Sequence, residues 1–200
     1  MKLFLKISIF FILFTNFAKA NESSDWLKSE IDNILNTYNN DSISNEQRFE
    51  AIENSINKNF AGAGIAKFVA GKSWGSANKD TKREYVKLFK RHLALNIASM
   101  MQGYSNQNYN LISNKYDEKS KVYLIDMNIE YDTGSLLVTW RVKESKNKFF
   151  VIDLLVADIS LVVTKRSEFN SLLKKEGFKL KNFNKILKSQ NEISYKKLIQ

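Results

Sequence analysis

The chain has 200 residues, of which 31 are Lys or Arg and 21 are Asp or Glu, so its net charge of +10 favours anionic partners. It contains no cysteine, which excludes disulfides, thiolate metal sites and thiol nucleophiles. The length suits one domain whose stability comes from a sizeable core.

The first twenty residues have the pattern of a secretory signal peptide. Lys2 and Lys6 lie beside an apolar run over residues 7–14, and the small residues Ala18 and Ala20 follow. The run is shorter than the roughly 20 residues that a transmembrane helix needs. We therefore expect residues 1–20 to be a signal peptide that is cleaved after Ala20.

Export narrows the choice of anionic partners. Residues 1–20 contain three lysines and no acidic residue, so the charge of residues 21–200 is +7. An exported protein seldom meets nucleic acid, which leaves lipid headgroups and acidic protein surfaces as candidates. Because the lysines are scattered along the chain, general solvation accounts for part of the excess charge.

The chain from residue 24 to residue 102 has the spacing of amphipathic helices. Ser24 is a candidate N-cap for a helix whose apolar positions are Leu27, Ile31, Ile34, Leu35 and Tyr38. Residues 39–42 break this helix, and Ser44 with Gln47 forms a capping box for the next one. That second helix is expected to bury Phe49, Ile52, Ile56 and Phe60. A short helix over 61–70 ends at Gly71, and Asn78 caps a long helix over 79–102.

Alternation with a period of two then predicts an antiparallel meander of four strands over residues 123–131, 136–143, 150–156 and 160–164. Short turns at 132–134 and 146–147 join the first three as hairpins. A helix that Gly177 ends and a final helix follow. The prediction is an α+β fold whose sheet has one face covered by helices. Periodicity does not distinguish a solid core from a cavity at this face.

Residues suited to catalysis are few. His92 is the one histidine of the chain, so we expect an ordinary helix-surface or core-edge residue and no metal site. Asp126, Glu130, Asp153 and Asp158 lie on the strands, and only Asp153 interrupts an apolar run. A cone-shaped α+β isomerase or hydrolase using Asp153 is therefore an alternative function. No sequence motif indicates a cofactor.

A series of short motifs follows in a defined order over roughly residues 45–190. They are Gly71-Lys72-Ser73-Trp74, Tyr85 with Phe89, Trp140-Arg141, Asp153, Ser160-Leu161-Val162, Thr164-Lys165-Arg166, Phe169 and Gly177. Together they resemble the MlaC, or toluene-tolerance, family of periplasmic phospholipid-binding proteins.

Two positions depart from the family pattern. Asp158 stands where the family usually has glycine, but Asp tolerates positive φ better than most residues, so we expect the turn to form. Phe150 replaces the tryptophan usual in that strand, which keeps an apolar side chain and loses an N–H donor.

The resemblance implies a periplasmic, non-enzymatic carrier that moves phospholipid between the outer and inner membranes. It implies an inner-membrane MCE-type ABC transporter and an outer-membrane lipoprotein complex as partners, with residues 21–200 as one lipid-binding domain, a monomer without cofactor. We expect the following residues to bind lipid: Trp74, Phe89, Leu93, Ile97, Met101, Ile125, Met127, Val138, Trp140, Ile152, Leu154 and Val156. An adaptor that binds only protein is a further alternative.

The export signal generates the first testable prediction. Protein recovered from the periplasmic fraction should begin at Asn21, because the small residues at Ala18 and Ala20 fit the narrow site of signal peptidase. Intact-mass measurement checks this result. Periplasmic protein that retains Met1 would contradict it.

Overall fold

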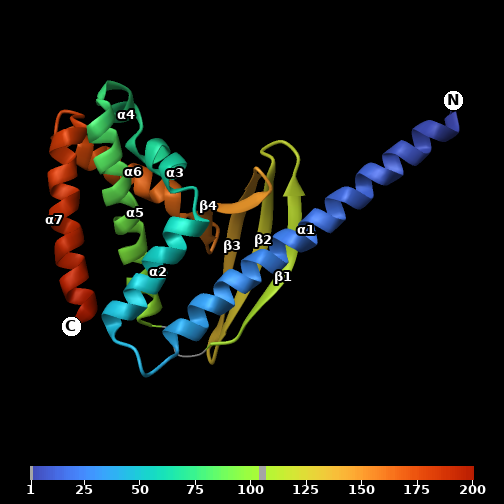
Figure 1. Ribbon diagram of the computed structural model, residues 1–200, viewed down its shortest axis with the longest axis horizontal. Coiled ribbons are helices and arrows are strands. Elements are labelled where there is room, and N and C mark those ends of the chain that lie inside the picture. The colour runs from blue at the N-terminus through green and yellow to red at the C-terminus, as the bar shows by residue number, and fades with distance from the viewer. Residues whose placement is uncertain (1, 104–106) are drawn as a thin grey trace.

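The elements of the computed structural model follow the expected order of helices, sheet and helices (Figure 1). Residues 2–103 and 107–200 are described, with the side chains of residues 20–103 and 107–200. The helices are α1 (Lys2–Tyr38), α2 (Asn45–Asn59), α3 (Gly62–Ala70), α4 (Lys72–Ser76), α5 (Lys79–Met101), α6 (Leu161–Lys175) and α7 (Leu180–Ile199). The strands are β1 (Tyr109–Asp117), β2 (Val122–Tyr131), β3 (Gly134–Ser145), β4 (Lys148–Val156) and β5 (Ile159–Ser160).

Several local signals in the sequence produce the expected helix ends. Ser44 and Gln47 form the full capping box at the start of α2, and Asn78 caps α5 by accepting a hydrogen bond from the Thr81 backbone N–H at 2.8 Å. Gly177 follows α6 with φ of +60°. These positions confirm the predicted starts of α2 and α5 and the end of α6.

The start of the first helix differs from the prediction. Ser24 lies inside α1, which begins at Lys2, so Ser24 is not an N-cap. Its hydroxyl instead accepts a hydrogen bond from Asn114 Nδ2 at 2.6 Å, which fastens α1 to β1. The side chains of the signal-peptide pattern, residues 2–19, lie outside the described side chains. Among the described residues, none of the helices has the length and hydropathy needed to cross a bilayer.

The sheet has five antiparallel strands in the order β1-β2-β3-β4-β5, one more than predicted. The additional strand, β1, escapes prediction because its alternation ends at Leu111, where a register shift before Ser113 precedes a polar stretch. The turn at Lys146 and Asn147 has φ of +52° and +57°, as expected for a tight hairpin. Asp158 adopts φ of +64°, so the turn before β5 forms without glycine.

The predicted strand over 160–164 is wrong beyond its first residue. Only Ile159 and Ser160 pair with β4, and α6 begins at Leu161. Ser160 Oγ accepts from the Val163 N–H at 3.0 Å, and Asp153 Oδ1 accepts from the Val162 N–H at 3.1 Å. These two acceptors satisfy free N–H groups of the first helical turn and so favour helix over strand.

Two layers position the site (Figure 1). The sheet is one layer, and α2, α3, α5, α6 and α7 form the other, while α1 crosses between them and packs on β1, β2 and α2. The helical layer has an aromatic core of Tyr85, Phe89, Phe169 and Phe183, with ring centroids 4.9 to 6.3 Å apart. This layer is solid, so the open space of the fold lies on the other side of α5, toward the sheet.

His92 lies at the edge of the aromatic core, as predicted. Its ring is tilted against Phe169 at 5.4 Å, and its Nδ1 lies 3.1 Å from Asn191 Oδ1. Burial, with a smaller effect from nearby Lys165, lowers the pKa of His92 from 6.5 to about 4. Glu168 and the Asn191 contact oppose this shift only in part.

The lowered pKa predicts a loss of stability on acidification between pH 6.5 and 4. In this window the unfolded chain binds a proton at His92 that the folded chain excludes, which costs up to about 3 kcal/mol of unfolding free energy. Urea unfolding of wild type and His92→Gln across this range checks the prediction, since Gln does not titrate. Equal pH dependence in both proteins would contradict it.

Candidate functional site

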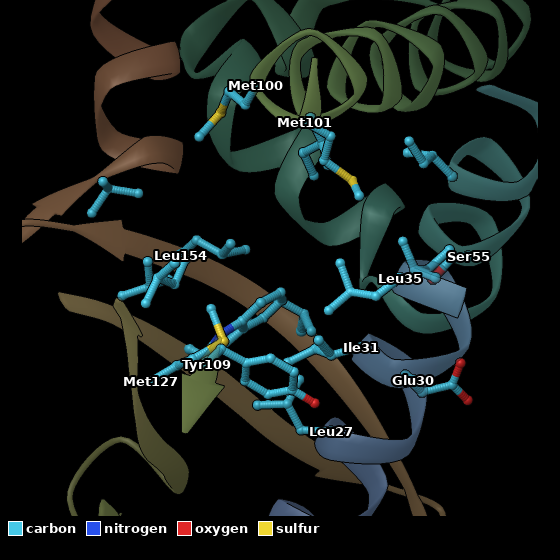
Figure 2. Close-up of a pocket in the computed structure, with 18 of the residues that line it drawn as sticks. Leu27, Glu30, Ile31, Leu35, Ser55, Met100, Met101, Tyr109, Met127 and Leu154 are labelled. Atoms are coloured by element: carbon cyan, nitrogen blue, oxygen red, sulfur yellow. The ribbon is translucent and has the colours of Figure 1, made fainter. Parts of the chain in front are cut away.

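A cavity of about 400 Å³ lies between the sheet, α1, α2 and the C-terminal end of α5. In Figure 2, Met100 and Met101 of α5 approach Met127 and Leu154 of the sheet from above, and α1 closes one side. The volume falls within the range of about 300 to 1,000 Å³ that is typical of ligand pockets. Its lining is almost entirely aliphatic, aromatic and thioether groups.

The inner face of the sheet is solid in one half and hollow in the other. Toward the start of β2, Tyr123, Ile125 and Val142 are buried against Leu27 of α1 in a closed cluster. Further along β2 and β3, Met127 and Val138 are also buried but line the cavity. The face that the sequence left undecided therefore contains both a core and a cavity.

Seven of the twelve predicted lipid-binding residues line this cavity. They come from the last turns of α5 and from the inner face of β2, β3 and β4. They are Ile97, Met101, Met127, Val138, Trp140, Leu154 and Val156. Period-two alternation on the strands found most of them, because alternate residues share a face.

The other five lie elsewhere. Phe89 is buried in the aromatic core of the helices, and Leu93 packs against this core and the α2 core. Ile125 belongs to the solid half of the sheet, and Trp74 lines a separate hollow at the far end of α5. A stripe along a long helix spans several environments, so the helical period did not show which part of α5 meets the cavity.

Ile152 is displaced by a β-bulge in β4. Val151 pairs with Val142 and Asp153 pairs with Arg141, so Ile152 is an extra residue opposite this junction. Because of the extra residue, the inward-facing positions shift by one before the bulge. Val151 therefore lines the cavity, and Ile152 does not.

Helices α1 and α2 supply lining residues that the sequence analysis did not assign to the site. These are Trp26, Leu27, Ile31, Ile34 and Leu35 of α1, and Ile52 and Ile56 of α2, with Phe60 after it. Apart from Trp26, these residues were predicted from their helical spacing to form apolar faces. Only the tertiary position of α1 across the sheet shows that this face covers a cavity.

One corner of the cavity is polar. Glu30 accepts hydrogen bonds from Lys58 Nζ at 2.9 Å and from Asn59 Nδ2 at 2.7 Å, and Asn59 Nδ2 also lies 3.2 Å from Ser55 Oγ. Figure 2 shows the Glu30 carboxylate at the edge of the pocket, pointing away from its apolar centre. Glu30 is the single charged residue among the described lining residues.

A second polar group is the indole N–H of Trp140. This nitrogen is buried and has no hydrogen-bond partner among the described residues. A buried donor without an acceptor costs free energy, about 1 to 3 kcal/mol. The nitrogen itself is not exposed to the cavity, which Trp140 lines with its other atoms.

Asp153 lies outside the cavity lining and has structural partners. Besides the Val162 N–H, it accepts from Ser160 Oγ at 2.6 Å and lies 3.6 Å from Arg141 Nη1. It is buried, and it joins β4 to β3 and α6. Within the described part of the chain, no group of His, Cys, Asp and Glu is arranged to hold a metal ion. The cavity is suited to hold an apolar ligand with one polar end.

Comparison with known proteins agrees with this fold. A family model described as MlaC protein matches residues 28–189. A solved structure, described as the phospholipid-binding protein from Ralstonia solanacearum in complex with a phospholipid, superposes with a TM-score of 0.73. It is 17% identical, and the match covers 84% of this chain and 96% of that one. No curated protein matches the sequence significantly.

The position of Asp153 leads to a prediction. Asp153→Asn should lower the unfolding free energy by about 1 to 3 kcal/mol, because the amide N–H₂ cannot accept the bonds that the carboxylate accepts. It should leave cavity occupancy unchanged, as measured by the ligand content of the folded protein. The control, Asp158→Asn, changes an exposed residue at positive φ that Asn tolerates. Loss of ligand in folded Asp153→Asn would contradict the structural role.

Proposed function

The chain belongs to the MlaC family, and we propose that it is a non-enzymatic carrier that encloses the acyl chains of a phospholipid. The observation that carries the proposal is the apolar cavity between the sheet, α1, α2 and α5. The phospholipid named in the description of the Ralstonia structure supports the choice of ligand.

The energetics of an acyl chain explain why such a carrier needs a cavity. Burying a methylene is worth about 0.8 kcal/mol, so a chain of about 16 carbons represents roughly 12 kcal/mol. A lipid cannot cross water at this cost without shelter. Two lining residues at the end of α5, Met100 and Met101, are flexible and polarisable, and such side chains adapt to ligands of irregular shape.

The polar groups of the cavity suit the other parts of a phospholipid. The corner formed by Glu30, Ser55 and Asn59 offers both acceptors and donors to a headgroup.

We further propose that the carrier acts in the periplasm after cleavage of residues 1–20 and moves phospholipid between the outer and inner membranes. In this scheme the lipid is exchanged with an outer-membrane lipoprotein complex and an inner-membrane MCE-type ABC transporter. The chain has no nucleotide-binding motif, so any energy input comes from a partner. Family membership and the export signal support this role.

Filling the cavity tests the proposal. Val138→Trp places a large side chain in the space of the acyl chains, so the delipidated protein should stay folded while bound lipid, measured by mass spectrometry, falls several-fold. Ile152→Trp would not test the cavity, because Ile152 does not line it.

The matched control is Val142→Trp, four residues along the same strand and on the same face. Val142 is fully buried in the solid half of the sheet, where overpacking typically costs about 1 to 3 kcal/mol. Its unfolding free energy should fall more than that of Val138→Trp. A folded Val138→Trp protein that retains all its lipid would contradict the assigned cavity.

A further inference from the structure

Lysines occur throughout the chain, but two segments carry its net positive charge. Residues 67–87 and 174–185 contain eleven Lys or Arg and three Asp or Glu, a net charge of +8. Residues 21–200 carry +7 in total, so the remainder is almost neutral, at −1. The basic character of the protein therefore belongs to these segments.

The two segments meet at one end of the helical layer, here called the basic end. Asn184 Nδ2 of α7 donates to the Thr81 carbonyl at 3.2 Å and to Glu84 at 2.8 Å, which aligns the starts of α7 and α5. Lys72 Nζ lies 3.4 Å from the ring centroid of Phe178, so α4 adjoins the turn before α7. Figure 1 shows α4 beside the beginning of α7. The positive dipole ends of α5 and α7 add to the charge.

Aromatic side chains lie among these cations. Trp74 forms a shallow hollow with Lys79, Lys82, Arg83 and Val86, and Lys82 Nζ lies 5.5 Å from the indole centroid. Nearby on α3, the Phe68 ring is exposed, and the guanidinium carbon of Arg166 lies 4.3 Å from its centroid. Tryptophan and lysine together are typical of surfaces at the membrane interface, where the ring sits at headgroup level and the ammonium reaches phosphate.

The basic end is remote from the cavity. Lys79 begins α5, and Met101 at its other end lines the cavity. At 1.5 Å per residue the two ends of α5 are about 30 Å apart. A surface bound at the basic end would therefore leave the cavity unobstructed.

We propose that the basic end binds the surface of an anionic phospholipid bilayer. Ten of its eleven cations are lysines, whose mobile, strongly hydrated ammonium groups suit a diffuse layer of phosphates. Protein interfaces are depleted in Lys and enriched in Arg, so an acidic protein partner fits less well. Each Lys near an anionic membrane surface adds favourable binding free energy, and the contributions of several lysines add up to stable binding.

Vesicle sedimentation tests the proposal with the mature chain, residues 21–200, after removal of bound lipid. The protein should bind an equal mixture of phosphatidylcholine and phosphatidylglycerol at low salt, bind phosphatidylcholine alone weakly, and dissociate as salt rises. The triple variant Lys79→Glu, Lys82→Glu, Lys179→Glu should weaken binding on the order of a hundredfold. Its folding is favoured, because acidic residues stabilise the starts of α5 and α7.

The control is a triple variant on the strands and turns of the sheet, in which Lys119, Lys143 and Lys148 are each changed to Glu. Its net charge changes by the same amount, and it should bind vesicles as wild type does. The Val138→Trp protein should also bind as wild type, so failure of the lipid cavity and failure of the basic end are distinguishable. Equal losses in the two triple variants would overturn the proposal. Binding to polyglutamate without binding to anionic vesicles would overturn it in favour of an acidic protein.

Discussion

The structure depends on a mismatch between the apolar area of the sheet and the helices available to cover it. One end of the inner face is closed by Leu27 of α1 on Ile125 and Val142. Toward Met127 and Val138, the helical layer stands away from the sheet, so these buried side chains line a cavity. An apolar cavity of this size gains free energy when an apolar ligand fills it, which is the physical basis of the proposed lipid binding.

The hydrogen bonds of α1 keep this cavity open and in place. Asn114 of β1 holds the helix at Ser23 and Ser24, and Glu30 links it to Lys58 and Asn59 at the end of α2. These polar contacts lie at the sides of α1, while its apolar stripe faces the cavity. The helix therefore acts as a fixed wall whose inner surface is free to contact lipid.

Sequence reasoning predicted the parts that depend on local periodicity and capping. Alternation on β2 and β3 identified Met127, Val138 and Trp140, and the capping residues fixed the starts of α2 and α5. Sequence reasoning did not predict which side chains face the cavity where tertiary contacts determine this. The bulge at Ile152 changed which residues of the first part of β4 face the cavity, and Phe89 joined the helical core, because neither the bulge nor the packing of α7 is encoded in a short window.

The central claim is that the cavity holds a phospholipid, and mass spectrometry of the protein purified from its native compartment without delipidation tests it most directly. Native spectra should show the folded chain with bound phospholipid, and solvent extraction should release that lipid in a stoichiometric amount. Folded wild-type protein that carries no lipid, and takes up none from vesicles, would contradict the account.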